Sequence, residues 1–243
     1  MSSITWTPDA LSSEARRFNR TVWRMVEAQH VASTMKLVDT AAEQDLLEEI
    51  IEESKPPLPE DARDLDYLLA APFRYTPFPP GSRFRSPADP GVFYGAESVR
   101  TAAAEVGYWR WKFLGETAGL ERLGPAPHTA FSVPIDARGL DLREPPFDRD
   151  SEAWSNPRDY SATQGFSSIA REANIEAIFY RSVRDPDPSW CAAILTPRAF
   201  AAKVPGSAMQ TWQLVVTREE VIWRRGAGET HSFITVGPLR SWP

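Results

Sequence analysis

The alternation of hydrophobic and polar positions predicts several short strands. Runs rich in β-branched and aromatic residues, bounded by turn-forming residues, are typical of strands. They occur at 21–28, 91–96, 128–135, 176–182 and 190–195, followed by a hairpin of 208–217 with 221–225 and a last strand at 232–236.

Helical periodicity appears in the segments between these strands. A capping box that starts at Thr40 predicts a helix that stops before Pro56, and a short helix is expected near 64–70. Ser98 is a suitable N-cap for a further helix. The apolar face of that helix is expected to consist of Ala102, Val106, Trp109 and Phe113. Asn156 followed by proline predicts the start of another helix, which runs to about residue 173.

The remaining segments predict irregular structure. Proline-rich turns are expected over 72–90 and a polar loop over 136–154, while residues 1–20 are expected to form a loose N-terminal arm. Strands and helices do not alternate regularly, and the last third is rich in strands with short connections. This order favours an α+β fold with a mixed sheet over a parallel doubly wound sheet. We expect a single domain over 21–243, with a helical insertion at about 31–70.

Composition narrows the function classes. The formal net charge is −6, which argues against a non-specific nucleic-acid binder. Cys191 is the single cysteine, so no disulfide can form within the chain. The residue is expected to be buried in the fold, and a chain without disulfides fits a cytoplasmic location. No apolar run reaches the about 18 residues that span a bilayer, and the N-terminal residues lack a secretory signal pattern.

Arginine is strongly preferred over lysine. Four of the 27 basic residues are lysines, so 23 are arginines. A GC-rich genome is the simpler explanation. The alternative is recognition of an anionic ligand, because guanidinium groups bind phosphates bidentately.

Several common catalytic patterns are missing. His30, His128 and His231 lie far apart without ligand spacing, so a metal site is not supported. There is no nucleophile elbow, phosphate-binding P-loop or dinucleotide-binding glycine motif. The acidic run at 48–53 is better explained as a solvated helix face. The aromatic residues at 108–111 are expected in the core rather than stacked on bases.

One ordered set of residues stands apart. The turn Gly81-Ser82-Arg83-Phe84 precedes a strand that ends in Tyr94-Gly95-Ala96, and the next helix presents Glu105. Farther along, a strand ends in Tyr180-Arg181-Ser182. Over about 22–195 this order resembles the RES-domain family, which is named for its Arg, Glu and Ser residues. The helical material before the Arg83 turn and the long continuation after Ser182 indicate a longer subtype.

The resemblance implies a fold similar to that of ADP-ribosyltransferases, with a mixed, split sheet, and a reaction on NAD. On the matched positions, Glu105 would stabilise a cationic ribose, and Arg83 would bind the diphosphate. Tyr94 would stack on nicotinamide, and Ser182 would orient the ribose or the catalytic side chains. Arg24 and Arg74 are secondary candidates for phosphate binding.

Each assignment has a structural alternative. Glu105 would instead be a solvent-facing residue paired with Arg100 or Arg110, and Arg83 a loop residue that satisfies carbonyl groups. Tyr94 would be a core residue, and Ser182 the cap of the turn that follows it.

The resemblance further implies a bacterial toxin that depletes NAD and arrests growth. The acceptor stays open, so the enzyme is a hydrolase, a phosphorylase or an ADP-ribosyltransferase. Alternatives from other classes are a non-catalytic nucleotide- or protein-binding module and a DNA-binding regulator. The expected partner is an Xre-type helix-turn-helix antitoxin that covers the active site. Direct contacts with nucleic acid or membrane and a metal cofactor are not expected, and homo-oligomer formation is left open.

Overall fold

The computed structural model describes residues 6–28, 39–74, 81–235 and 242. Its strands are β1 (Arg16–Glu27), β2 (Phe93–Ala96), β3 (Leu123–Asp141), β4 (Ala177–Arg181), β5 (Trp190–Ile194), β6 (Gln210–Val216), β7 (Glu220–Arg225) and β8 (Glu229–Ile234). Its helices are α1 (Pro8–Glu14), α2 (Ala41–Ser54), α3 (Tyr67–Arg74), α4 (Val99–Glu116), α5 (Ser151–Trp154) and α6 (Ser161–Glu172), with 3-10 turns η2 (Glu60–Ala62), η3 (Phe147–Asp150) and η4 (Pro197–Ala199). The predicted α+β class with a mixed sheet and flanking helices is confirmed.

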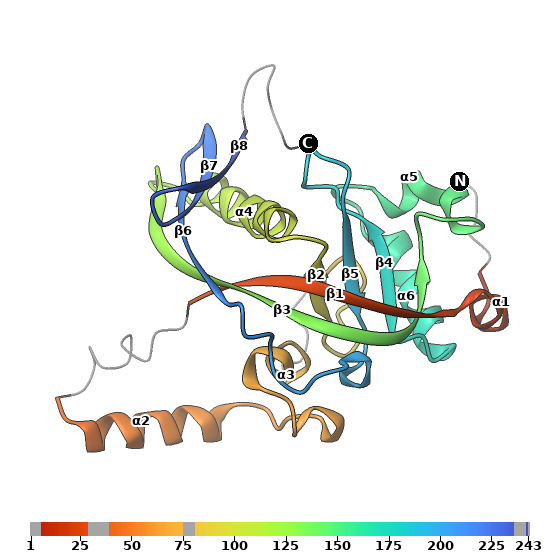
Figure 1. Cartoon of the computed structure of the whole chain (residues 1–243), viewed down its shortest axis with the longest axis horizontal. Helices are drawn as coiled ribbons and strands as arrows, with labels where there is room; N and C mark the ends of the chain where they lie inside the picture. The colour runs from red at the N-terminus through yellow and green to blue at the C-terminus, as the bar shows by residue number, and fades with distance from the viewer. Residues whose placement is uncertain (1–5, 29–38, 75–80, 236–241, 243) are drawn as a thin grey trace.

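The eight strands form one sheet in the order β1-β2-β5-β4-β3-β6-β7-β8. β3 is long enough to pair antiparallel with β1 and β6 and parallel with β4. β1 also meets β2 at the pair Trp23 and Ala96, so β1, β2, β5, β4 and β3 close into a ring. The strands β6 to β8 extend the sheet beyond this ring (Figure 1).

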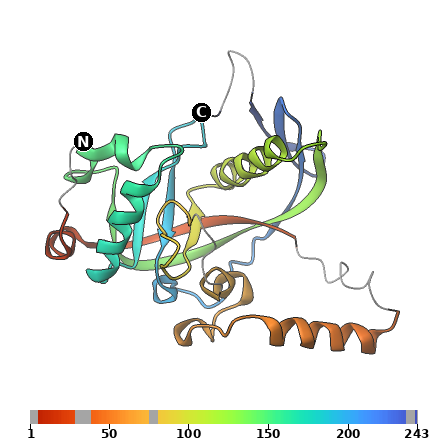
Figure 2. The ribbon, with the colours of Figure 1, turned by 180° about the vertical axis from the view of Figure 1, so that it is seen from behind.

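Two groups of buried side chains cover the two faces of the sheet. Phe93, Phe131 and Phe179 belong to one group, which packs against α3 residues such as Leu69. The other group lies under α4 and α6, which cross the sheet at opposite ends when seen from behind (Figure 2). Each large apolar side chain buried in this way contributes roughly 1.5–3 kcal/mol by its removal from water.

Helix α4 approaches the sheet closely because its inner face is built from small residues. Ser98 caps the helix by accepting a hydrogen bond from the Thr101 amide at 3.1 Å. Ala103 and Ala104 are buried, and a Cβ atom added to Gly107 would lie 2.9 Å from Val221 Cγ1. The close approach fixes the helix that carries Glu105 against β1, β2 and the β6–β8 end of the sheet.

The expected loose N-terminal arm is wrong from residue 8 onward, and residues 1–5 lie outside the described part. Thr7 caps helix α1, Pro8 occupies its first turn, and Leu11 is 0% exposed. Strand β1 then begins at Arg16, five residues before the predicted start. The residue pair Thr7-Pro8 was a helix-start signal that the polar composition obscured.

Other boundaries also differ from the prediction. β3 continues to Asp141, through the first part of the expected loop, because it pairs with β1 and β4. α6 begins at Ser161 rather than after Asn156, whose side chain instead accepts hydrogen bonds from the amides of residues 158 and 159 in a turn. The expected core face of α4 is wrong at its outer positions, since Trp109 is 47% and Phe113 51% exposed.

The capping box of α2 is confirmed, and η2 and α3 follow within the expected helical insertion, whose residues 31–38 lie outside the described part. The last strand begins at Glu229, three residues earlier than predicted, and position 236 is outside the described part. None of the described helices has the length and apolar character that a bilayer crossing requires.

Candidate functional site

A cavity of about 440 Å³ opens where α4 meets β1, β2 and the turn before β2. Four of the residues singled out from the sequence line it, namely Arg24, Arg83, Tyr94 and Glu105. They come from positions 24 to 105 and are brought together because β1 lies beside β2 and α4 packs on both.

Glu105 is held with one carboxylate oxygen fixed. Its Oε1 accepts a hydrogen bond from Ser182 Oγ at 2.7 Å and lies 3.6 Å from Cys191 Sγ. Arg100 pairs with Asp185 and Asp187, and Arg110 pairs with Glu27. Neither arginine pairs with Glu105, so the solvent-facing alternative does not describe its position.

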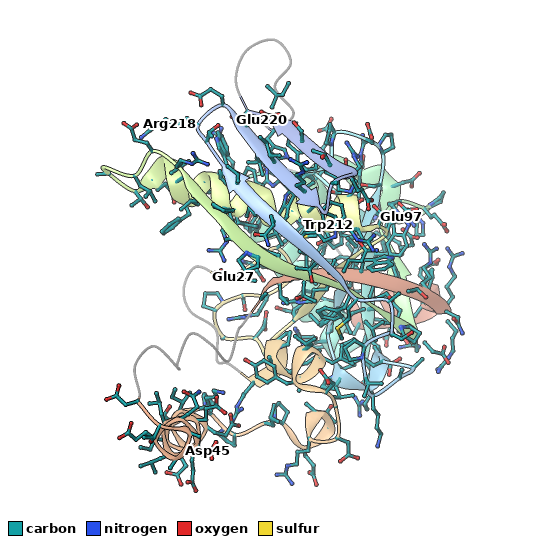
Figure 3. All side chains as sticks on the ribbon, turned by 60° about the vertical axis from the view of Figure 1, so that its left-hand side comes forward. Glu27, Asp45, Glu97, Trp212, Arg218 and Glu220 are labelled. Carbon is teal, nitrogen blue, oxygen red and sulfur yellow. The ribbon has the colours of Figure 1, made fainter. Side chains whose placement is uncertain are left out.

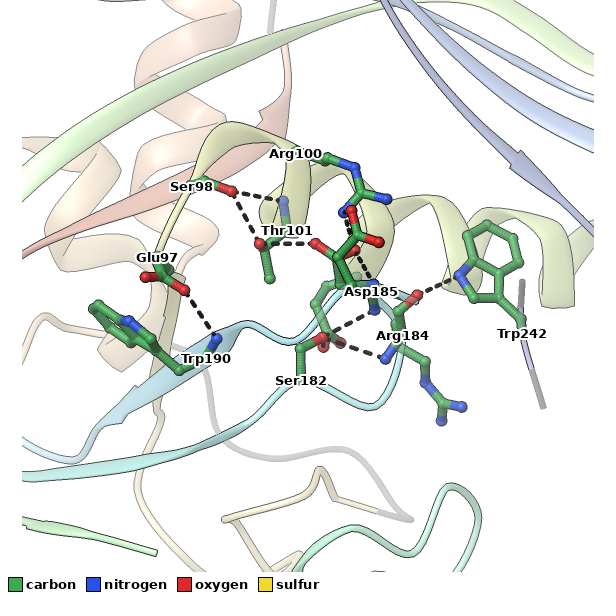
Figure 4. A network of polar contacts seen from close by, with 11 residues as sticks. Glu97, Ser98, Arg100, Thr101, Ser182, Arg184, Asp185, Trp190 and Trp242 are labelled. Atoms are coloured by element: carbon green, nitrogen blue, oxygen red, sulfur yellow. Dashed lines mark hydrogen bonds and ion pairs between the residues drawn. The ribbon is translucent and has the colours of Figure 1, made fainter. Parts of the chain in front are cut away.

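Ser182 lies behind Glu105 rather than on the cavity wall. Its hydroxyl donates to Glu105 and accepts from the amides of Arg184 at 3.3 Å and Asp185 at 3.1 Å. The residue therefore also caps the turn that follows β4, which is the structural alternative stated above. Figure 4 shows this turn, with Ser182, Arg184 and Asp185 gathered against the start of α4.

Arg83 is buried, and one of its guanidinium nitrogens is already hydrogen-bonded to the protein. Its Nη1 donates to the carbonyl oxygens of Trp154 and Asn156, both at 2.9 Å, and its guanidinium lies 4.6 Å from the ring centre of Tyr160. These bonds satisfy carbonyl groups, as the structural alternative states. Within the described residues, its Nε and Nη2 donate to no protein group. They are the donors that a ligand in the cavity can reach.

The turn that carries Arg83 is held by Gly81 and Tyr94. Gly81 has a φ of 84°, and an added Cβ would lie 2.3 Å from the Arg85 carbonyl oxygen, so the turn requires glycine. The Tyr94 hydroxyl bonds Ser82 Oγ at 2.7 Å and accepts from the Phe84 amide at 3.0 Å. Burial raises the pKa of Tyr94, which keeps the hydroxyl protonated for these bonds. Tyr94 is also one of the residues that line the cavity.

Arg24 enters the cavity from β1. Its Nη1 donates to the Tyr94 carbonyl oxygen at 2.9 Å, and its guanidinium lies 4.7 Å from the centre of the Phe93 ring. Its Nε is buried without a partner in the described residues. Burial lowers the pKa of Arg24 to about 10, because the charged form has lost solvent.

Arg74 lies elsewhere. It donates to Glu52 at 2.6 Å and to the Pro56 carbonyl oxygen at 2.6 Å, and so ties the end of α3 to α2. It is not among the residues that line the cavity.

The structure adds to the cavity wall Arg184 and Tyr160, which were not predicted as site residues from the sequence, and places there Trp109, which was expected in the core. Arg184 is 1% exposed, and its guanidinium lies 3.5 Å from the ring centre of Tyr108. Its Nη2 donates to the Pro157 carbonyl oxygen at 2.5 Å, while Nη1 is buried without a partner in the described residues. A charged residue two positions after Ser182 was the available signal.

Two further groups on the cavity wall are held neutral. Burial raises the pKa of the Cys191 thiol well above its usual value, and the neighbouring Glu105 adds to the effect. Burial likewise raises the pKa of Tyr180 well above its usual value. Cys191 is therefore a protonated wall residue rather than a thiolate nucleophile.

A second hollow of about 730 Å³ opens near the start of β5. Its wall mixes acidic and basic side chains, including Glu97, Glu152, Arg143 and Arg181. None of the six candidate site residues, Arg24, Arg74, Arg83, Tyr94, Glu105 and Ser182, lines it. Among the described residues, no three His, Cys, Asp or Glu side chains lie together in a way that would hold a metal ion.

Comparison with known proteins gives one family match. The model of the RES domain matches residues 58–217. No curated protein matches the sequence. Among solved structures, one chain of the M. tuberculosis MbcT-MbcA toxin-antitoxin complex is similar, with 13% sequence identity and a TM-score of 0.49. That alignment covers 87% of this chain and 92% of the other.

Proposed function

This chain belongs to the RES-domain family, and we propose that it cleaves NAD at the bond between nicotinamide and ribose. The observation that carries the proposal is the charge of the cavity. Arg24, Arg83 and Arg184 line it, and Glu105 is its one acidic residue. Among the described residues, none of the three arginines forms an ion pair with a carboxylate.

Unpaired buried cations are costly, because a charge withdrawn from water needs a compensating partner. An anionic ligand supplies that partner. The diphosphate of NAD carries two negative charges and offers several acceptor oxygens, which suits guanidinium donors. Arg83 Nε and Nη2 and the unpartnered Nε of Arg24 are the donors we assign to this binding.

Glu105 is assigned the chemical step. In NAD the nicotinamide ring is cationic, and it leaves as a neutral molecule when the C–N bond breaks and the bonding electrons move to the ring nitrogen. The ribose carbon becomes positively charged as the bond lengthens. A carboxylate beside it stabilises that charge, as carboxylates do in glycoside hydrolysis.

The acceptor is water, inorganic phosphate or a protein side chain. When it is water, its oxygen forms a bond to the cationic ribose carbon, and one of its protons is released, so the products are ADP-ribose, nicotinamide and a proton. The bond from Ser182 to Oε1 fixes the carboxylate, and its Oε2 stays available to the ribose. Tyr94 presents its ring to the nicotinamide, in keeping with its place on the cavity wall.

We further propose that the protein is the cytoplasmic toxin of a bacterial toxin–antitoxin pair. Membership of the RES-domain family supports this role. Unrestrained cleavage of NAD would poison the host cell, so such an enzyme needs a partner that neutralises it. A cognate antitoxin, with an Xre-type DNA-binding part, would cover the cavity. The charge of −6 suits a toxin whose DNA contacts come from its partner.

The test is release of nicotinamide from NAD by the purified protein and by Glu105→Gln. The substitution keeps the shape of the side chain and removes its charge, which should cost on the order of 2–4 kcal/mol of transition-state stabilisation, or about 30- to 1,000-fold in turnover. Glu116→Gln is the matched control, since Glu116 lies on the same helix, is exposed, and pairs only weakly with Lys112 at 3.7 Å. Its turnover should equal that of the wild type.

Wild-type turnover in Glu105→Gln would remove Glu105 from the reaction, and absence of nicotinamide release by the wild type would refute NAD cleavage. Mass spectrometry of the product identifies the acceptor. ADP-ribose indicates a hydrolase, and a phosphorylated ADP-ribose formed only with inorganic phosphate indicates a phosphorylase. A mass increase on a protein from added lysate indicates an ADP-ribosyltransferase.

A further inference from the structure

Trp242, which lies beyond residue 217 where the family match ends, contacts Arg184 of the cavity wall. Trp242 is 2% exposed, and its indole Nε1 donates to the Arg184 carbonyl oxygen at 2.6 Å. Figure 4 shows this bond at the end of the polar network that starts at Ser98. Trp242 itself does not line the cavity.

The indole ring also packs on the platform beneath Arg184. It meets the Tyr108 ring edge to face, with centroids 5.8 Å apart, and stacks on Phe233 of β8 at 5.5 Å. The Arg184 guanidinium lies over the same Tyr108 ring, 3.5 Å from the ring centre. Trp242 therefore contacts both the backbone of Arg184 and the ring on which its side chain lies.

A glycine in α4 lies where β7 and Trp242 pack on the helix, and the close approach of β7 requires it. A Cβ added to Gly107 would lie 3.4 Å from Trp242 Cη2, 3.2 Å from Trp223 Nε1 and 2.9 Å from Val221 Cγ1. The same small position thus admits β7 onto the helix that carries Glu105, next to Trp242.

We infer that Trp242 is a positioning residue that holds Arg184 at the cavity for an anionic group of the ligand. Without the indole, the Arg184 carbonyl oxygen loses the N–H group that donates a hydrogen bond to it. The Tyr108 ring also loses one of the side chains that pack against it. Arg184 is buried with Nη1 unpartnered in the described residues, so nothing else recorded for that nitrogen fixes its direction. Nη2 donates to the Pro157 carbonyl oxygen and, at 3.3 Å, to the Tyr160 hydroxyl, so the direction of Nη1 depends on the Tyr108 ring and on the backbone that Trp242 holds.

The first test is a nuclear magnetic resonance measurement that does not depend on any substrate. The Arg184 Nε proton should resonate upfield, because the guanidinium carbon to which Nε is bonded lies 3.5 Å from the centre of the Tyr108 ring, and its signal is assigned by its loss in Arg184→Lys. Trp242→Phe keeps an aromatic ring and removes the N–H donor, and it should move this signal toward the value of a solvated arginine.

The matched control is Trp212→Phe. Trp212 is also fully buried, and its Nε1 donates to Gln210 Oε1 at 3.0 Å on β6, outside the cavity. Both substitutions remove one indole hydrogen bond from a buried site, so a purely structural role predicts equal effects. An unmoved Arg184 signal in Trp242→Phe would overturn the inference.

The second test rests on the proposed function and follows NAD turnover. Loss of one neutral hydrogen bond that orients Arg184 should raise KM about three- to tenfold in Trp242→Phe. Because Glu105 is held by Ser182, kcat should stay within about twofold, and Trp212→Phe should leave both constants unchanged. In an Arg184→Lys background, Trp242→Phe should add no further rise in KM.

The outcomes separate the two claims. A moved Arg184 signal with unchanged KM would show that Arg184 does not bind the substrate and would overturn the ligand-binding part. If the wild type releases no nicotinamide, the proposed function fails, and the resonance alone decides the role of Trp242. Trp242→His, which keeps a ring with an N–H donor, should leave the signal closer to its wild-type position than Trp242→Phe does, and it provides a second variant should Trp242→Phe not fold; an equal displacement in both would count against the hydrogen bond to the Arg184 carbonyl.

Discussion

Replacing Ser182 by alanine removes the hydroxyl on which the turn after β4 and the carboxylate of Glu105 both depend. The hydroxyl donates to Glu105 Oε1 at 2.7 Å and accepts from the amides of Arg184 and Asp185 at 3.3 and 3.1 Å. Ser182 is buried, so water does not replace these partners freely.

The expected loss of stability follows from the three hydrogen bonds that the Ser182 hydroxyl makes. The bond to the Glu105 carboxylate is charge-assisted and contributes about 1.5–3 kcal/mol, and the two longer amide bonds contribute about 0.5–1 kcal/mol each. Ser182→Ala should therefore lower the free energy of unfolding by about 2.5–5 kcal/mol. That is a large share of the roughly 5–15 kcal/mol typical of a folded domain.

Urea unfolding measures the loss of stability. The dependence of the free energy of unfolding on urea concentration should be the same in both proteins if only the native state changes. NAD turnover is then measured at a temperature at which both proteins remain folded. The free Glu105 side chain should reduce turnover by about tenfold or more, since a misplaced carboxylate loses orientation.

Ser167→Ala is the matched control. Ser167 is fully buried and donates one hydrogen bond, to the Phe84 carbonyl oxygen at 2.7 Å, without contacting Glu105. Its loss should be about 1 kcal/mol, with turnover less affected than in Ser182→Ala. If the two variants lose the same stability and the same activity, the central role of Ser182 is refuted.

Two further predictions concern buried basic groups. Arg24→Met should leave the melting temperature unchanged or higher while it weakens NAD binding in calorimetry, because burial already lowers the pKa of Arg24 to about 10 and the charge is costly without a ligand; a lower melting temperature with unchanged affinity would contradict this. Burial also lowers the pKa of His128, so the folded protein binds the imidazole proton less tightly than the unfolded chain, whose histidine titrates near about 6.5. Stability should consequently fall as the pH drops below about 6.5, and His128→Gln should make that decrease shallower in unfolding titrations at pH values from about 7 to 5; an unchanged slope would show that other groups, such as His231, account for it.

Much of the element content was predictable because the local signals agree with the tertiary fold. The capping box at Thr40 and the N-cap Ser98 both start helices as expected. The errors arise where tertiary pairing overrides local composition. The polar residues after Ile135 form a strand because β1 pairs with them, and the alternating burial along β3 appears only once that partner is known.

The candidate site was predictable only in part for the same reason. Arg83, Tyr94 and Glu105 follow from an ordered motif, and they line one cavity. The position of Arg184 depends instead on Tyr108 and on Trp242, far away in sequence. The place of Arg184 two residues after Ser182 was the available signal, but the sequence pattern does not show that three distant segments build its environment.

The net charge of the chain argues against nucleic acid as a ligand but does not reveal a site for a small anion, because the charges are unevenly distributed. Helix α2 contains six acidic residues and no basic one, and so carries as much negative charge as the whole chain has in excess. Figure 3 shows α2, on which Asp45 is labelled, standing apart from the sheet. Surface charges are screened beyond about 8 Å in physiological salt, whereas the arginines of the cavity are buried and screened much less. The acidic surface therefore disfavours contact with nucleic acid, while the cavity still attracts a small anion that enters it and supplies the counter-charge its arginines lack.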